Sequence, residues 1–246
     1  MHGKRSTFLI LCVAALALFP GPAYAMHIAE CILPWPWAGL WFAVSLPFVW
    51  WGLHDIQKRS RQRPYMKALV GLVGAAVFII SCMPVPVPWV GTCSHPCGTG
   101  LAAILIGPAA TVVVASVALL LQALFLAHGG LTTLGANILS MGIAGAFVGY
   151  GVFRLARRLG ASYFVAAFLA GLLSDWATYA VTSYELASAL CGQHSFQKMF
   201  LTILVAFAPT QIPLGVAEGM VSGMACAFVL SRRPELLGRL AEGNCA

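Results

Sequence analysis

The sequence predicts an all-α polytopic membrane protein with about seven transmembrane helices after a cleaved signal peptide. Of its 246 residues, 60% are hydrophobic and 9% are charged, with a mean hydropathy of +0.88. A soluble domain carries about 25% charged residues, so this composition indicates a chain that faces lipid. The net charge of +7 comes from short basic runs between apolar segments, which is typical of cytoplasmic loops. We therefore expect the lipid bilayer as a partner and no nucleic acid.

Residues 1–25 have the three parts of a secretory signal peptide. Two basic residues stand near the start, an apolar run follows, and Ala23-Tyr24-Ala25 forms a small-x-small cleavage box. Cleavage after Ala25 would make Met26 the mature N-terminus. The rest of the chain, residues 26–246, is then one transmembrane domain.

The apolar segments of the mature chain follow one another with short connections. They lie near residues 37–53, 67–83, 99–127, 133–153, 163–181 and 200–230. The third is counted as a short crossing plus a full one, because Gly107-Pro108 interrupts it. The last contains Pro209 and Pro213 and is predicted to start as a broken or tilted helix.

Seven crossings put every basic run on one side of the membrane. The runs lie at 58–63, 154–158 and 232–233. By the positive-inside rule this side is the cytoplasm, so the C-terminus is inside and the mature N-terminus is periplasmic or extracellular. We expect a multi-pass protein of the cell inner (plasma) membrane.

A histidine in second position gives the expected mature N-terminus a specific chemistry. The amine of Met26, the deprotonated backbone amide of His27 and its Nδ1 can close two fused chelate rings around one metal ion. A fourth nitrogen would complete a planar set, which suits Cu(II) or Ni(II) and is possible for Co(II). The alternative is an accidental histidine in an unstructured N-terminus.

Four other histidines of the mature chain are candidates for the fourth nitrogen. His95 lies in a Gly- and Pro-rich loop on the outer side and is the best partner for His27. His128 is also placed outside and is the reserve. His54 should lie at the cytoplasmic end of the first span, and His194 reads as an ordinary loop residue.

Four motifs, in order along the mature chain, carry a resemblance to a known family. They are Met26-His27-Ile28-Ala29-Glu30, Gly91-Thr92-Cys93-Ser94-His95-Pro96-Cys97-Gly98-Thr99-Gly100, Leu126-Ala127-His128-Gly129-Gly130-Leu131-Thr132-Thr133-Leu134-Gly135-Ala136-Asn137, and Thr210-Gln211-Ile212-Pro213 with Ala217-Glu218-Gly219. With them the chain resembles the CbiM/NikM family. The resemblance implies the substrate-binding component of an energy-coupling factor importer for Co²⁺, or for Ni²⁺ in the NikM relatives. It implies a metal site made by Met26, His27 and His95.

The resemblance also implies partner subunits. The sequence has no Gly-x-x-x-x-Gly-Lys-Ser/Thr loop, so we expect no ATP site and no enzyme activity in this chain. The family's partners are the small membrane subunit CbiN, the coupling subunit CbiQ and the ATPase CbiO. The small residues around Gly71 are a candidate contact with the coupling subunit.

Two cysteines depart from the family pattern, Cys31 in place of Gly and Cys97 in place of Thr. Because both flank the expected site in an oxidising compartment, we hypothesise a Cys31–Cys97 disulfide. The alternatives are a thiolate ligand that favours softer ions, and two independent packing residues.

Several polar residues are candidates for supporting the metal site or for coupling to other subunits, rather than for binding the metal directly. They are Glu30, His128, Asn137, Asp175, Gln211 and Glu218. Two other functional classes are alternatives to an importer. An intramembrane metalloenzyme would need a His-Glu-x-x-His helix, which the sequence lacks. A membrane-anchored metal sensor or chaperone would explain the chelate but not the seven spans.

Overall fold

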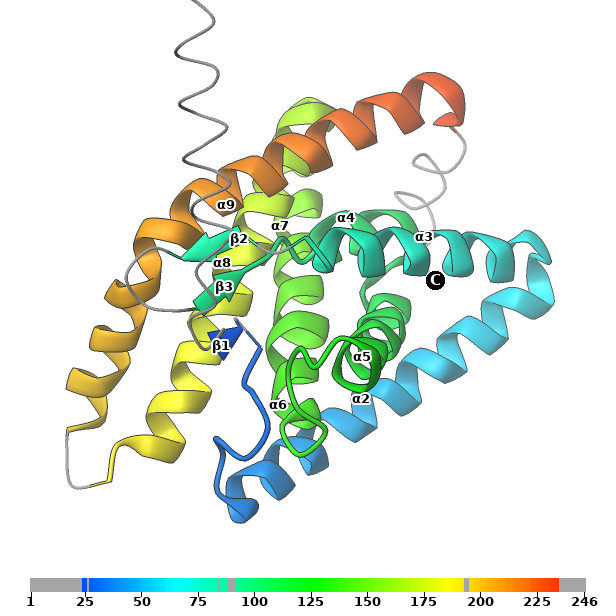
Figure 1. Ribbon diagram of the computed structural model, residues 1–246. Helices are drawn as coiled ribbons and strands as arrows, with labels where there is room; N and C mark the ends of the chain where they lie inside the picture. The colour runs from blue at the N-terminus through cyan, green and yellow to red at the C-terminus, as the bar shows by residue number, and fades with distance from the viewer. Residues whose placement is uncertain (1–23, 26, 84, 88–91, 193–194, 235–246) are drawn as a thin grey trace, which may run out of the picture.

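The protein is described by a computed structural model that covers residues 24–25, 27–83, 85–87, 92–192 and 195–234. The expected signal peptide before Tyr24, the expected N-terminal Met26 and His194 lie outside these residues. The all-α prediction is confirmed: long helices cross one another to form a bundle (Figure 1).

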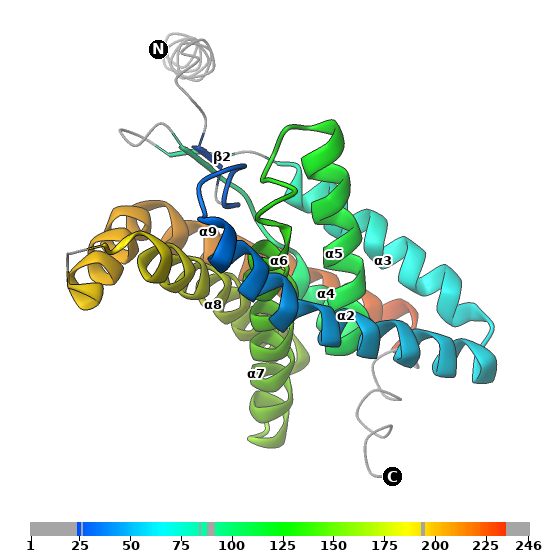
Figure 2. The same ribbon diagram turned by 90° about the horizontal axis from the view of Figure 1, so that it is seen from below.

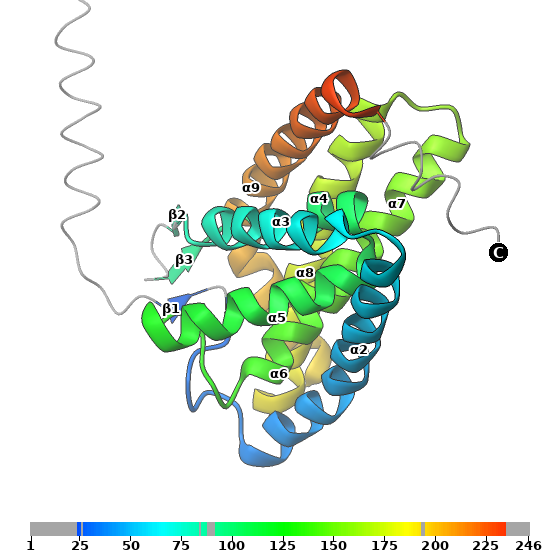
Figure 3. The same ribbon diagram turned by 90° about the vertical axis from the view of Figure 1, so that its right-hand side faces the viewer.

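Helical segments stand at all seven predicted positions in the described residues. They are α2 (Trp35–Gln62), α3 (Tyr65–Ser81), α4 (Thr99–Ile106), α5 (Pro108–Phe125), the continuous run of α6 (Leu134–Asn137), the π-helix η1 (Ile138–Gly145) and α7 (Ala146–Arg158), then α8 (Tyr163–Leu190) and α9 (Phe196–Arg232). Four of them are long and apolar enough to cross a membrane: α5, the α6–η1–α7 run, α8 and α9. The turned views show α2 running across the bundle and α3 beside α5 (Figures 2 and 3).

The predicted break at Gly107-Pro108 is confirmed and makes α4 short. Gly107 has φ +86°, which favours glycine, and Pro108 opens α5. With eight residues, α4 is about 12 Å long and covers less than half of an apolar core of about 30 Å. Arg59 on α2, which pairs with Asp55, donates to the Ile106 carbonyl at the end of α4 at 2.6 Å.

The last segment was predicted to start as a broken or tilted helix, and the break is wrong, because α9 continues through both prolines. Side chains of α8 donate hydrogen bonds to α9 carbonyls near the prolines. Tyr179 reaches Leu204 at 2.5 Å, and Trp176 reaches Gln211 at 3.2 Å. These bonds hold α9 against α8 along the stretch that contains the prolines.

A small sheet lies above the bundle, which the sequence did not predict. Its order is β1 (Tyr24–Ala25), β3 (Thr92–Ser94), β2 (Val85–Val87). β1 runs parallel to β3, with Ala25 opposite Cys93, and β2 runs antiparallel to β3. The sheet therefore joins the last two residues of the expected signal peptide to the strand that leads into the His95 loop, and cleavage after Ala25 would remove β1.

The helix faces rich in small residues, around Gly142, Gly219 and Gly71, differ in what they pack against. A Cβ on Gly142 would lie 3.3 Å from Ala115 of α5, and one on Gly219 would lie 2.8 Å from a carbonyl of α8. These faces therefore pack within the chain. A Cβ on Gly71 of α3 would meet nothing within 4 Å, so that face is open.

Candidate metal centre

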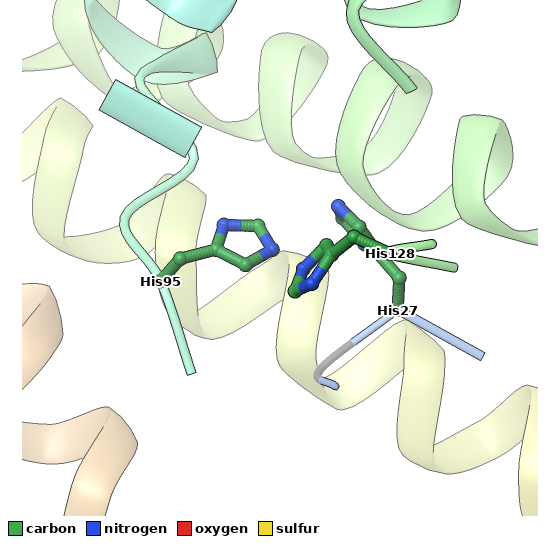
Figure 4. A group of neighbouring side chains, drawn as sticks. All are labelled: His27, His95 and His128. Atoms are coloured by element: carbon green, nitrogen blue, oxygen red, sulfur yellow. The ribbon is translucent and has the colours of Figure 1, made fainter. Parts of the chain in front are cut away.

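Three histidines from three separate segments meet beside the sheet. The ring centres of His27 and His95 lie 4.4 Å apart, and the ring of His128 lies 5.1 Å from the first and 5.0 Å from the second. One ring nitrogen from each lies within 4.8 Å of the others. Figure 4 shows the three side chains directed toward a common space. His95 is fully buried and His27 is 2% exposed.

His27 is positioned through the backbone of the residue that follows it. The Ile28 N–H donates to Asn137 Oδ1 at 2.9 Å, and the Ile28 carbonyl accepts from Asn137 Nδ2 at 3.2 Å and from Thr133 Oγ1 at 2.5 Å. Asn137 closes α6, and Thr133 stands immediately before it. The start of the α6 run therefore holds the N-terminal segment in place.

Glu30 fastens the same segment to the loop that follows His128. Its carboxylate accepts hydrogen bonds from the N–H groups of Leu131 at 2.5 Å and Thr132 at 3.2 Å. Hydrogen bonds from Thr132 and then Leu131 lower the pKa of Glu30, so it stays ionised. Its described hydrogen bonds hold this loop and do not involve the ring of His27.

The His95 loop is anchored from α9. The two oxygens of Glu218 accept hydrogen bonds from Cys97 N at 2.7 Å and Gly98 N at 2.9 Å, and Gln211 Nε2 lies 2.5 Å from Ser94 Oγ. Irregular backbone inside a membrane bundle needs such internal partners. The polar residues of α9 thus fix both sides of His95.

Hydrogen bonds select which nitrogens remain open to a ligand. The Pro96 carbonyl can only accept, so His95 Nδ1, at 3.1 Å, carries the proton and Nε2 keeps its lone pair. His95 Nε2 is buried and has no hydrogen-bond partner. His128 Nε2 is also buried and without a partner. An unpartnered pair of buried nitrogens is costly unless a ligand uses them.

Gln122 of α5 fixes the tautomer of His27. Its Nε2 donates to Ser81 Oγ at 2.7 Å, so its Oε1 is the atom that faces His27 Nε2 at 3.2 Å. An amide oxygen accepts, which places the proton of His27 on Nε2 and leaves Nδ1 with a lone pair. A cavity lined by Ser81, Cys82, Gln122, Leu126 and His128 adjoins this contact.

The three imidazoles are neutral at physiological pH. Burial, reinforced by the neighbouring histidines, lowers the pKa of His27 well below 6.5. Burial and the nearby His128 lower the pKa of His95 to about 4, and burial lowers that of His128. Neutral imidazole is the form that binds metal, so the nitrogen donors are ready without losing a ring proton to solvent.

Of the histidines singled out in the sequence, His27 and His95 come together and the reserve, His128, joins them. The signal for His128 is the glycine pair that follows it. Gly129 has φ +80°, and a Cβ there would lie 3.2 Å from the Cβ of His27. His54 lies on α2, outside this cluster.

The hypothesised disulfide does not form, since Cys31 and Cys97 are both free thiols. Cys31 is exposed, and its N–H lies 3.4 Å from Thr132 Oγ1. Cys97 is buried beneath the His95 loop, between α8 and α9. The loop thus directs the Cys97 side chain into the bundle and away from the exposed Cys31. Neither thiol belongs to the histidine cluster.

A family model described as the cobalt uptake substrate-specific transmembrane region, CbiM, matches residues 27–236. The chain belongs to the CbiM family. It is 58% identical over 223 residues to the cobalt transport protein CbiM of Geobacter sulfurreducens, covering 91% of this chain and 64% of that protein. The chain therefore spans less than two thirds of this relative's length. It is 60% identical over 215 residues to the cobalt transport protein CbiM of Sorangium cellulosum, covering 87% of this chain and 96% of that one.

Two solved structures share the CbiM fold of this chain. A truncated transition metal transporter aligns with a TM-score of 0.71 and 25% identity, covering 84% of this chain and 99% of that one. A transition metal transporter aligns with a TM-score of 0.74 and 23% identity over 89% and 98% of the two chains. The second likeness concerns the fold alone.

Proposed function

We propose that this CbiM-family chain is the membrane component that captures Co²⁺ on the outer side of the inner membrane and passes it to an energy-coupled importer. The observation that carries the proposal is the buried histidine cluster, in which the unpartnered Nε2 of His95 faces the second residue of the expected mature chain. Its relatives are named cobalt transport proteins, which favours cobalt over nickel as the cargo.

The proposed ligands are the amine of Met26, the backbone nitrogen and Nδ1 of His27, and Nε2 of His95. The tautomers support this set, because Nδ1 of His27 and Nε2 of His95 are the two nitrogens that keep lone pairs. The residue after Met26 supports it as well, because the His27 ring lies against His95. His128 offers a further nitrogen at the same place.

Signal-peptide cleavage after Ala25 is the step that creates the site in this proposal. In the uncleaved chain the nitrogen of Met26 is an amide and cannot act as the terminal donor. Removal of residues 1–25 would convert it into an amine on the residue before His27, whose ring lies against His95. Metal capture would thus be confined to protein that has been exported and processed.

Transport energy would come from other subunits. We propose an ATPase (CbiO), a transmembrane coupling subunit (CbiQ) and a small membrane subunit (CbiN) as partners. The open Gly71 face of α3 is the proposed contact with the coupling subunit, because small residues let two membrane helices approach closely.

The test starts from the purified mature protein, with its N-terminus read by intact mass and terminal peptide sequencing and its bound metal measured. The expected result is a start at Met26 and tight binding of cobalt. An added Ala before Met26, or His95→Ala, should abolish tight binding, whereas His54→Ala on α2 should leave it unchanged. Tight cobalt binding by the chain with its signal attached would refute the ligand set. Competition between Co²⁺ and Ni²⁺, followed by uptake of each radiolabelled ion with the partner subunits, decides the cargo.

A further inference from the structure

A second group of metal-ligating side chains lies inside the bundle, separate from the histidines. It consists of Cys97 from the loop, Asp175 from α8 and Glu218 from α9. One donor atom from each lies within 4.8 Å of the other two. The exposed fractions are 0% for Cys97 and Asp175 and 3% for Glu218. One loop and two helices therefore bring a sulfur and two carboxylates to one buried place.

The carboxylate of Asp175 lacks the partners that burial requires. Both of its oxygens are buried and make no hydrogen bond, and among the described residues no Lys or Arg pairs with it or with Glu218. An ionised carboxylate without a partner is expensive in the interior of a membrane protein. The side chain is also directed into the interface of α8 and α9, because Asp175 Oδ2 lies 3.2 Å from a Cβ built on Gly215. A proton or a cation is needed at this point.

Glu218 is oriented so that it can bind a cation while it anchors the loop. Each oxygen accepts one backbone N–H, from Cys97 and from Gly98, and each keeps a second lone pair.

This donor set is selective in its chemistry. Ca²⁺ and Mg²⁺ take oxygen ligands in sets of six or more, whereas a sulfur with two or three oxygens suits a four-coordinate divalent transition metal such as Zn²⁺ or Co²⁺. With metal–sulfur and metal–oxygen bonds of about 2.3 and 2.1 Å, tetrahedral ligand atoms stand about 3.6 Å apart. Donors within 4.8 Å of one another reach that spacing by moving about 1 Å.

We propose that Cys97, Asp175 and Glu218 form a second, intramembrane site for a divalent transition metal ion. The site lies two residues further along the same loop than His95, so one loop presents a donor to each site. Its existence does not depend on metal binding by the histidines. It assigns a ligand role to Cys97, the cysteine whose predicted disulfide does not form.

The experiment uses Co²⁺ and the purified full-length processed protein, and it measures stoichiometry and the optical spectrum together. A thiolate bound to Co²⁺ gives a sulfur-to-cobalt charge-transfer absorption in the near ultraviolet, which an all-nitrogen site does not give. The wild type should bind about two cobalt ions per chain and show this band. His95→Ala should bind about one ion and keep the band. Cys97→Ser should remove the band and leave histidine-site binding in place.

Matched variants keep the test decisive. Cys226→Ser removes another buried thiol and should leave the band unchanged. Asp175→Asn, which is isosteric, should weaken the second ion about 10-fold to 100-fold while the thiol remains. It serves in place of Cys97→Ser if that variant does not fold. A wild type without the band, a band that survives Cys97→Ser, or an Asp175→Asn protein with unchanged affinity would each overturn the proposal. A wild type that binds only one cobalt ion and shows the band would instead support the second site and refute the capture site at the histidines.

Discussion

Asn137 binds both backbone polar groups of Ile28, accepting from its N–H at 2.9 Å and donating to its carbonyl at 3.2 Å. The pair joins residues that are 109 positions apart in the chain and places the residue before Ile28, His27, against His95. A ligand in a mobile terminal segment needs such a clamp, because each freedom it loses on binding metal reduces affinity.

Replacing Asn137 by Ala should therefore weaken Co²⁺ binding about 10-fold to 100-fold without removing a ligand, as is usual for residues that orient a ligand. The loss is read by competition with a chelator of known affinity. Asn244 is the other Asn of the chain and lies outside the described residues. Asn244→Ala is therefore the control that makes the same substitution elsewhere. Equal affinities in wild type and Asn137→Ala would show that the N-terminal segment is held without this clamp.

Gln122 tests the tautomer of His27. Gln122→Leu removes the acceptor for His27 Nε2–H, so the proton can move to Nδ1, the nitrogen that the proposed chelate needs. We expect Co²⁺ affinity to fall about tenfold or more and the protein to lose about 1–3 kcal/mol of stability from the unpaired ring nitrogen. Gln57→Leu on the exposed side of α2 is the control. Unchanged affinity would mean that the cluster binds metal through His27 Nε2.

Gly130 allows a close contact between the N-terminal segment and the His128 loop. A Cβ at this position would lie 2.6 Å from Glu30 Cα and 2.7 Å from Glu30 N, which are backbone atoms that cannot step aside alone. Gly130→Ala should displace residues 27–30 and reduce Co²⁺ affinity at least tenfold. At Gly39 a Cβ would meet nothing within 4 Å, so Gly39→Ala should bind as the wild type does. Chelator competition on both variants gives the comparison.

Much of the helical layout follows from hydropathy and from a few residues. Gly107-Pro108 predicts the break between α4 and α5, and the basic runs give the number of crossings. The sequence does not predict the continuity of α9, which is held by hydrogen bonds from Tyr179 and Trp176 of another helix. The π-helix η1 after Asn137 has no signal in the sequence, since nearly all of its residues are apolar or glycine and the shift in register that an extra residue causes leaves no visible change in the pattern.

The sequence predicts the ligands of the metal site better than it predicts the residues that surround them. His27 and His95 stand out by chain position and by loop composition, whereas Gln122 sits in an apolar helix and becomes relevant only when α5 packs beside the N-terminal segment. The disulfide hypothesis rests on the positions of Cys31 and Cys97, which both flank the expected metal site in the sequence. Whether a loop side chain faces solvent or the bundle depends on long-range contacts such as Glu218 to Cys97, which no local pattern records.

The pH dependence of Co²⁺ binding separates an amine-containing site from a site made of imidazoles alone. The pKa of His95 is about 4 and that of His128 is lowered, so neither competes for protons near neutrality. The terminal amine, with a pKa of about 7.7 to 8.0, and the His27 amide both release a proton to the metal. The slope of log affinity against pH should be about 2 below pH ~7.5 and approach about 1 above pH ~8.5. A slope near zero from about pH 6 to 8, measured by titration in non-coordinating buffers, would contradict the amine ligand.

The open face of α3 should matter for transport but not for capture. Gly71→Leu adds a bulky side chain where nothing lies within 4 Å, so the fold and Co²⁺ affinity of the isolated chain should not change. If the coupling subunit docks there, the added side chain prevents close helix approach, and uptake of radiolabelled cobalt should fall at least tenfold in cells that also contain the partner subunits. Gly151→Leu on α7, which also meets nothing within 4 Å, is the matched control and should transport normally. Normal uptake by Gly71→Leu would place the coupling contact on another face of the bundle, and reduced metal affinity would show that the residue acts within the chain.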